Sequence, residues 1–217
     1  MENNDDNIME NNTTKNSKKW YFIIGGLAVG LFAGWLVITY FTGNLGPPNF
    51  HGMVMQSPDT LTNFTLDSAN GDVSLTDFRG KVTLLYFGYT FCPDVCPATM
   101  VELKKAMVEL GRDADDVQVI MVTIDPTRDT PEKIDAYVKH FYPSFIGLTG
   151  TDEEVAAVAV PLGIFYEKHE GSAESGYLID HTATVAVIDK DGYLRLIYPF
   201  NTAGEDIAKD LRYLVRD

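Results

Sequence analysis

The motif Cys92-Pro93-Asp94-Val95-Cys96-Pro97 holds both cysteines of the chain. It follows an apolar run at residues 82–87 and precedes a helix that we expect from about Pro97 to Leu110. A proline restricts the residue before it to an extended conformation and suits the first helical position, so Cys96 is predicted to be the N-cap. The unpaired amides and positive dipole end of that helix favour thiolate over thiol at Cys96. We therefore expect both sulfurs to be reactive.

The spacing of the two cysteines permits two kinds of chemistry. Residues four apart point in similar directions in a helix-like turn, and an irregular loop can bring both sulfurs within bonding distance. The pair is therefore predicted to be a metal clamp or a disulfide, with two inert buried cysteines as the alternative that needs no function. Thiolates select soft ions such as Cu(I) and zinc, and two sulfurs leave the usual tetrahedral zinc site half empty. A metal site needs a third ligand from elsewhere.

The N-terminal part of the chain predicts a membrane anchor. Residues 1–19 are Asn-rich and polar, which is typical of a disordered tail. Residues 20–41 contain no charged side chain, and as a helix they span about 33 Å, enough for one transmembrane helix. A cleaved signal peptide has a shorter apolar core and a small-residue cleavage site, so we expect an uncleaved anchor.

The charges around this apolar run predict its orientation. Lysines precede the run at positions 15, 18 and 19, and no cation follows it until Arg79. The positive-inside rule therefore places a cytoplasmic tail at residues 1–19 and the C-terminal domain on the extracytoplasmic side. Early acidic residues argue against a mitochondrial transit peptide. We expect a single-pass protein of a bacterial cell membrane.

Beyond the anchor, composition predicts a linker at residues 42–60 and one domain at residues 61–217. The linker contains His51, Met53 and Met55, to which the sequence assigns no role. Residues 43–217 carry 14 basic and 27 acidic side chains, and this net charge of −13 disfavours nucleic acid and anionic lipid as partners. Two cysteines form no structural disulfide framework, so the pair is available for chemistry.

Two nearly continuous apolar runs, residues 82–87 and 117–122, are typical of central strands covered on both faces. The helix between them completes a β-α-β unit and buries a stripe of Met100, Leu103, Met107 and Leu110. The cysteines then lie at the carboxyl end of the first strand, where open α/β sheets place their sites.

Further elements follow from turn and cap signals. They are a hairpin around Asn70-Gly71, helices that begin near Thr130, Thr151 and Thr202, and a late hairpin of residues 182–188 and 193–198. This order predicts an α/β thioredoxin-like fold with an inserted hairpin, preceded by one transmembrane helix.

Four histidines are candidates for the third ligand. His140 is expected on a helix surface, His169 in an exposed polar loop and His51 in the linker. His181 stands immediately before the strand expected from residue 182, and in a thioredoxin-like sheet the loop entering that strand faces the cysteine turn. We therefore expect His181 to be the ligand, with a structural histidine as the alternative.

The sequence resembles the Sco/SenC copper proteins, which are associated with cytochrome c oxidase assembly. The matching pieces follow the family order across roughly residues 60–200. They are Gly80-Lys81-Val82, Tyr86-Phe87-Gly88-Tyr89-Thr90, Cys92-Pro93-Asp94-Val95-Cys96-Pro97, Asp125-Pro126-Thr127-Arg128-Asp129-Thr130-Pro131, Gly147-Leu148-Thr149-Gly150 and Asp180-His181-Thr182. Phe91 stands where many members carry histidine, which removes an auxiliary ligand, and Thr182 replaces a frequent serine.

The resemblance implies a thioredoxin-like domain that binds one copper ion through Cys92, Cys96 and His181 and delivers it to the binuclear copper centre of the oxidase. Two thiolates and an imidazole suit Cu(I) and are able to hold Cu(II). Asp125 and Asp180 are candidates for orienting the ligating imidazole, or else are ordinary charged residues. A disulfide between the two cysteines would abolish copper binding.

These considerations favour a metallochaperone over an enzyme. Its expected partners are the copper-accepting subunit of cytochrome c oxidase and a periplasmic copper donor. One alternative is a membrane-tethered thiol-disulfide oxidoreductase that reduces the oxidase copper-site cysteines, although thioredoxin-type catalysts have two residues between their cysteines and this chain has three. A redox or copper sensor would share every motif.

Overall fold

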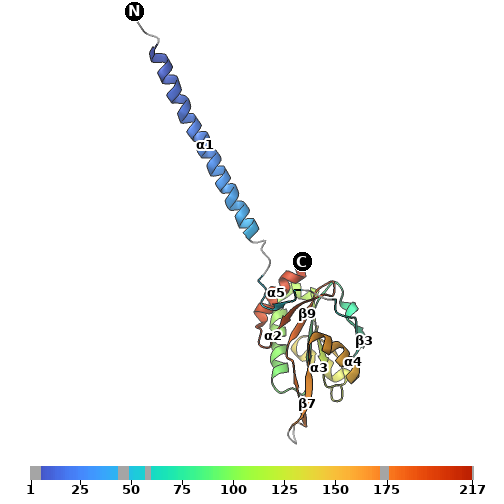
Figure 1. The fold of residues 1–217 in the computed structure, drawn as a ribbon. Helices are drawn as coiled ribbons and strands as arrows, with labels where there is room; N and C mark the ends of the chain where they lie inside the picture. Colours follow the sequence, from blue (N-terminus) through green and yellow to red (C-terminus); the bar gives the residue numbers. More distant parts are fainter. Residues whose placement is uncertain (1–5, 44–48, 57–59, 172–175, 217) are drawn as a thin grey trace, which may run out of the picture. The chain divides into compact units, whose positions relative to one another are not determined.

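The computed structural model describes residues 6–43, 49–56, 60–171 and 176–216 (Figure 1). The chain divides into two compact units, Met1–Pro48 and Asn49–Asp217. The first contains helix α1 (Asp6–Gly43), and its stretch Trp20–Thr39 is apolar and long enough to cross a membrane. The helix therefore extends into residues 6–19, which composition assigns to a disordered tail. Residues 1–5, and residues 44–48 and 57–59 of the expected linker, lie outside the described residues.

The second unit is built on a six-stranded sheet in the order β1-β10-β9-β4-β5-β6. Its centre is the parallel pair β4 (Val82–Gly88) and β5 (Val117–Thr123), in which every residue is buried. The predicted central strands are thus confirmed. β6 (Ile146–Leu148) continues the parallel part, and β9 (Val185–Ile188), β10 (Leu194–Tyr198) and β1 (Met53–Val54) form the antiparallel part.

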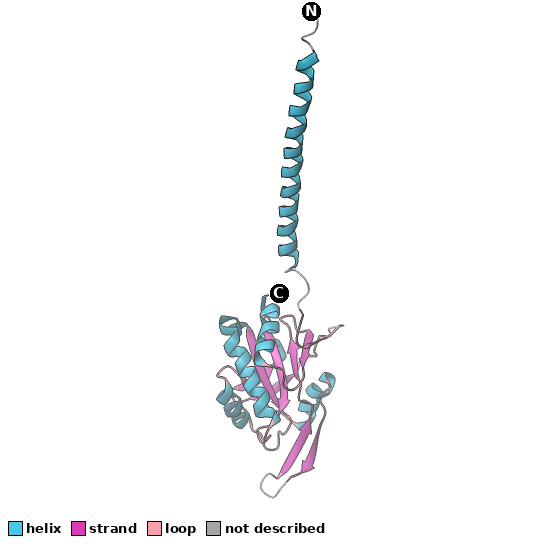
Figure 2. Cartoon of the chain, turned by 90° about the vertical axis from the view of Figure 1, so that its left-hand side faces the viewer, coloured by secondary structure: helices cyan, strands magenta, loops and turns pink. Residues whose placement is uncertain are grey.

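Helices cover this sheet (Figure 2). α2 (Val95–Leu110) connects β4 to β5 and packs against α3 (Pro131–Phe141) and α5 (Gly204–Arg216). α4 (Asp152–Ala159) follows β6, and short 3₁₀ helices span Leu75–Phe78, Gly111–Asp116 and Val160–Leu162. The predicted buried stripe of α2 and the predicted caps Thr130 and Thr151 are confirmed. The β-α-β unit followed by a late hairpin and a final helix is the predicted thioredoxin-like arrangement.

Two hairpins lie outside the central sheet. The one formed by β2 (Thr65–Ser68) and β3 (Gly71–Ser74) is predicted from its Asn-Gly turn. The other, β7 (Tyr166–Glu170) with β8 (Tyr177–His181), replaces the polar loop expected around His169 (Figure 1). Its β7 residues are largely exposed on both faces, so they lack the apolar alternation that marks a strand. His181 therefore ends β8, and the next strand begins at Val185.

The compact unit begins at Asn49, before the expected domain start at residue 61. β1 pairs with β10 at the sheet edge, Met53 opposite Ile197. Gly52 lies so close to Tyr198 that a Cβ there would be 2.8 Å from Cε1 of the tyrosine ring. Part of the expected linker is therefore integral to the sheet.

Candidate metal centre

Three ligand-type atoms meet at the carboxyl end of β4. One nitrogen of His181 and the sulfurs of Cys92 and Cys96 all lie within 4.8 Å of one another. Cys96 Sγ is 3.5 Å from His181 Nε2. Both cysteines are free thiols. Within the described ranges this is the one group of three or more His, Cys, Asp or Glu side chains arranged closely enough to hold a metal ion.

The turn between β4 and α2 positions the two sulfurs. The Cys92 amide donates to Tyr89 O at 3.2 Å, and the Cys96 amide donates to Cys92 Sγ at 3.3 Å. The helix begins at Val95 with Asp94 as its N-cap, so the prediction of Cys96 as N-cap is wrong. Pro97 fits within the first turn because the first amides of a helix have no partner inside it. Cys92 sulfur, rather than the Asp94 side chain, accepts from this helix end.

The two thiols differ in acidity. A hydrogen bond from Cys96 lowers the pKa of Cys92 to about 4, against the opposing effect of burial and with further hydrogen bonds from the backbone of Asp94 and Cys96. The hydrogen bond with Cys92, then burial, and to a smaller extent the negative charge of Cys92 raise the pKa of Cys96 above that of an ordinary thiol. Cys96 is fully buried, whereas Cys92 is half-buried. The expectation that both sulfurs are reactive is therefore corrected: the site holds one reactive thiolate and one protected thiol.

Gly88 makes room for the buried sulfur. A Cβ at this position would lie 2.9 Å from Cys96 Sγ and 3.0 Å from both Met121 Cε and Tyr86 Cε1. The last residue of β4 therefore has to be a glycine for Cys96 to occupy its place beneath the turn.

His181 presents Nε2 to the sulfurs. Its Nδ1 lies 3.2 Å from Thr182 O, so Nδ1 carries the proton and donates to this carbonyl, which leaves the Nε2 lone pair for a metal. The rings of Tyr86 and Tyr89 each stand edge-on to the imidazole, with centroids 6.2 Å away. The Tyr89 hydroxyl also accepts from the Ile179 amide at 3.1 Å and so fixes strand β8.

The structure does not bring the two predicted orienting carboxylates to His181. Asp125 is fully buried and accepts hydrogen bonds from the Arg128 guanidinium and, at 2.5 Å, from the Tyr177 hydroxyl. Asp180 is exposed, with its carboxylate 3.3 Å from Nε2 of His169. Among the described residues, a backbone carbonyl orients the imidazole instead, and no side-chain pattern in the sequence marks such an acceptor.

The other histidines lie elsewhere. His51 Nδ1 is 2.8 Å from the buried Asp210 carboxylate, and His140 stacks edge-on against Phe141 at the end of α3. Sequence reasoning missed Arg128, whose guanidinium lies over the ring of Phe91, the residue before Cys92, at 4.6 Å. The sequence does contain a signal for it: Arg128 follows Asp125 by three residues, a spacing that allows an ion pair within one turn.

The arrangement suits a soft metal ion. Two sulfurs and an imidazole nitrogen converge, and Cys92 and His181 are partly exposed while Cys96 is buried. An ion held here has protein on one side and an approachable side between Cys92 and His181.

Comparisons with known proteins show what the chain resembles. Residues 53–216 match the family model described as SCO1/SenC. The SCO2-like protein of Rickettsia felis is 36% identical over 138 residues, which cover 62% of this chain and 67% of that protein. Apo Sco1 from Thermus thermophilus has a TM-score of 0.70 and 42% identity over 78% of this chain and 99% of its own. Copper-bound ScoI from Arabidopsis thaliana has a TM-score of 0.67 and 31% identity; the match covers 73% of this chain and 99% of that protein.

Proposed function

The chain belongs to the SCO1/SenC family, and from this membership we propose that it is a membrane-anchored copper metallochaperone. It binds one copper ion through Cys92, Cys96 and His181 and delivers it to the binuclear copper centre of cytochrome c oxidase. The convergence of these three ligand atoms within 4.8 Å carries the proposal. The copper bound to the Arabidopsis relative and the family resemblance support copper as the cargo.

Each ligand has a distinct part in this mechanism. The Cys92 thiolate is charged and half-buried, so it meets the incoming ion first. The Cys96 thiol then gives up its proton to bind, and His181 supplies the Nε2 lone pair. Each copper ion loaded therefore releases a proton. Ligands of the acceptor enter on the side of Cys92 and His181, so that copper moves by ligand exchange without release into water.

Replacing His181 with Ala tests the proposal. Copper affinity, especially for Cu(II), should fall by well over the roughly tenfold that a loss of 1.4 kcal/mol represents. Thiol-disulfide exchange should persist, and thermal melts should change slightly because the imidazole lies at the end of a strand. His169→Ala, on the partner strand of the same hairpin, is the matched control and should bind copper normally.

Equal Cu(II) affinities of wild type and His181→Ala would remove this histidine from the site. A collapsed melt of the variant would make the histidine structural. Either result would count against the three-ligand chaperone.

A thiol-disulfide oxidoreductase acting on the oxidase copper-site cysteines is the second candidate. One observation favours it: the Cys96 amide donates to Sγ of the half-buried Cys92 at 3.3 Å, an environment that stabilises the thiolate that disulfide exchange requires. The reduced protein should bind one copper ion per chain and the disulfide form none. Reductase activity without copper binding would support the oxidoreductase instead.

We further propose that the domain lies on the extracytoplasmic side of a bacterial membrane, where a periplasmic donor supplies the copper. Lysines at positions 15, 18 and 19 precede the apolar helix and support this orientation. Alkaline phosphatase fused after Asp217 should be active, and a cytoplasmic reporter at the same point silent. The reverse pattern would contradict the orientation.

A further inference from the structure

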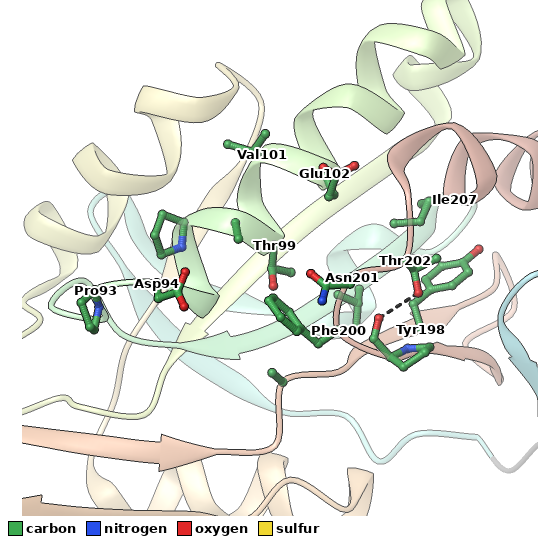
Figure 3. Close-up of a pocket in the computed structure, with 15 residues that line it drawn as sticks. Pro93, Asp94, Thr99, Val101, Glu102, Tyr198, Phe200, Asn201, Thr202 and Ile207 are labelled. Atoms are coloured by element: carbon green, nitrogen blue, oxygen red, sulfur yellow. Dashed lines mark hydrogen bonds between the residues drawn. The ribbon is translucent and has the colours of Figure 1, made fainter.

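We propose that an apolar groove beside the copper ligands binds an extended segment of the copper-accepting protein, with an apolar side chain in the groove and a Lys or Arg beside it. This inference rests on the function proposed above, because it names the surface through which the acceptor reaches the metal. The groove lies between the start of α2 and the loop that joins β10 to α5 (Figure 3).

The groove has a volume of about 420 Å³. Its apolar lining includes Pro93, Pro97, Tyr198, Phe200 and Ile207. Phe200, a large aromatic residue of the groove lining, is 37% exposed and so leaves apolar surface open to a partner. A cavity of this size and composition suits one or two apolar side chains.

The groove is lined by residues that adjoin the metal ligands in the chain. Pro93 and Asp94 lie between the two cysteine ligands, and Ala183 follows His181 by two residues; all three line the groove. An extended chain advances about 3.3 Å per residue, so residues two or three positions from an incoming metal ligand lie roughly 7–10 Å beyond it. A polypeptide that brings a ligand to Cys92 therefore has flanking residues within reach of the groove.

The charged residues of the groove lining favour a partner segment that carries a Lys or Arg. The charged lining residues are Asp94 and Glu102, and none of the described residues that line the groove is basic. Glu102 is already engaged, accepting from the Gly204 amide and from Lys105 Nζ. Asp94 is exposed and occupies the N-cap of α2, yet its side chain does not cap the helix. Its carboxylate is thus available to a cation on the partner.

The loop that carries Phe200 has an unusual backbone. Asn201 has a φ of +67°, and among the described residues it is the one non-glycine with positive φ. Thr202 closes the turn, with its amide 3.3 Å and its hydroxyl 2.8 Å from Pro199 O. Asn adopts this conformation more readily than other side-chain-bearing residues, and here it turns the chain directly after Phe200.

The test uses the full-length protein in lipid nanodiscs, loaded with Cu(I). The probe is the soluble domain of the oxidase subunit that carries the binuclear copper centre, from the same organism. For Phe200→Ser, the second-order rate constant of copper transfer to this probe should fall at least about tenfold. Copper affinity and transfer to a small Cu(I) chelator should be unchanged, because a chelator needs no docking surface. Asp94→Asn should weaken the salt dependence of transfer.

Phe165→Ser is the matched control. Phe165 is 70% exposed and contacts the loop of His181 through its backbone, but it does not line the groove. Its transfer rate should match that of wild type. Hydrogen–deuterium exchange gives the second readout: the probe should slow exchange at residues 93–99 and 198–204.

The outcomes separate this inference from the proposed function. Normal transfer by Phe200→Ser, or an equal loss in Phe165→Ser, overturns the groove and leaves the chaperone intact. If the probe slows exchange in both segments but wild type transfers no copper to it, delivery to the oxidase is overturned and the groove is upheld. If wild type shows neither copper transfer nor protection from exchange, both the groove and the proposed delivery are overturned.

Discussion

The guanidinium carbon of Arg128 lies 3.6 Å from the ring centroid of Tyr177, the first residue of β8. It also lies over the ring of Phe91, the residue immediately before Cys92, at 4.6 Å. Buried Asp125 accepts hydrogen bonds from both Arg128 and the Tyr177 hydroxyl. Burial, and then the hydrogen bond to this carboxylate, raise the pKa of Tyr177 to about 12, so its hydroxyl stays protonated and donates. Arg128 therefore joins the segment that carries Cys92 to the strand that carries His181.

Arg128→Ala should loosen this connection. We expect unfolding free energy to fall by about 2–4 kcal/mol, because Asp125 becomes an unpaired buried charge and the cation–π contacts with Tyr89, Phe91 and Tyr177 are lost. Copper affinity should fall several-fold as His181 loses its fixed distance from Cys92. Arg128→Lys should be intermediate, since lysine keeps the charge without the planar fork.

The matched control for Arg128 is Arg195→Ala, whose pair with Asp189 lies at 3.0 Å on the late hairpin. Thermal melts and copper titrations of the three variants check the prediction. Unchanged copper affinity in Arg128→Ala would show that Arg128 stabilises the fold but does not contribute to copper binding.

The alkylation rate of Cys92 should be nearly independent of pH between pH 6 and 8. Its pKa of about 4 keeps it a thiolate throughout this range, whereas an ordinary thiol would slow on the order of a hundredfold from pH 8 to pH 6. Folding lowers this pKa, so its contribution to stability is complete above the pKa of the unfolded thiol and is lost as the pH falls toward 4.

Iodoacetamide labelling followed by mass spectrometry measures the Cys92 rate. Cys96→Ala removes the strongest donor to Cys92 and should move the profile to higher pH. A wild-type rate that rises about tenfold per pH unit from 6 to 8 would contradict the assignment of the thiolate.

Gly88→Ala should damage the metal site through overpacking. The added methyl group would lie 2.9 Å from Cys96 Sγ, and such insertions typically cost about 1–3 kcal/mol. Gly147→Ala is a matched control, because its methyl group would collide with the backbone of Ile134, on α3. Both variants should melt earlier, but copper affinity should fall in Gly88→Ala alone. Equal affinities in the two variants would show that Cys96 sulfur tolerates displacement.

Asp210→Ala should release the beginning of the domain. This buried carboxylate accepts from the amides of His51 and Gly52 at 2.8 and 3.1 Å and from the Tyr198 hydroxyl at 3.2 Å. Leaving these donors without their acceptor should cost about 2–4 kcal/mol. Limited proteolysis should then cut faster within residues 49–56. Asp206→Asn, which alters a more exposed contact to the same histidine, should change little, and similar cleavage rates in both variants would refute the role of Asp210.

Sequence patterns predicted the elements in which local signals and tertiary packing agree. β4 and β5 are continuous apolar runs because both faces are buried, and Thr151 with Glu154 forms the predicted capping box. The grouping of Cys92, Cys96 and His181 was predictable because β9 runs antiparallel to β4, so the loop that enters β9 lies beside the carboxyl end of β4.

Other features depend on contacts that no local pattern encodes. The β7–β8 hairpin carries charged residues along its exposed strand, so its sequence resembles a loop. The inequality of the two thiols depends on the complete burial of Cys96 in a core formed by several strands and helices. The start of the domain at Asn49 depends on Asp210, distant in sequence.

The hydrogen bond from the Cys96 amide to Cys92 Sγ makes the helix end a sensor of what the sulfur is doing. A metal ion or a disulfide partner that takes up the lone pairs of this sulfur competes with the amide for them. Pro97, Ala98 and Thr99 follow directly and form one wall of the groove beside the site. In the proposed transfer, the loss of copper from Cys92 would restore this hydrogen bond and so link the state of the metal site to the wall on which the acceptor is docked.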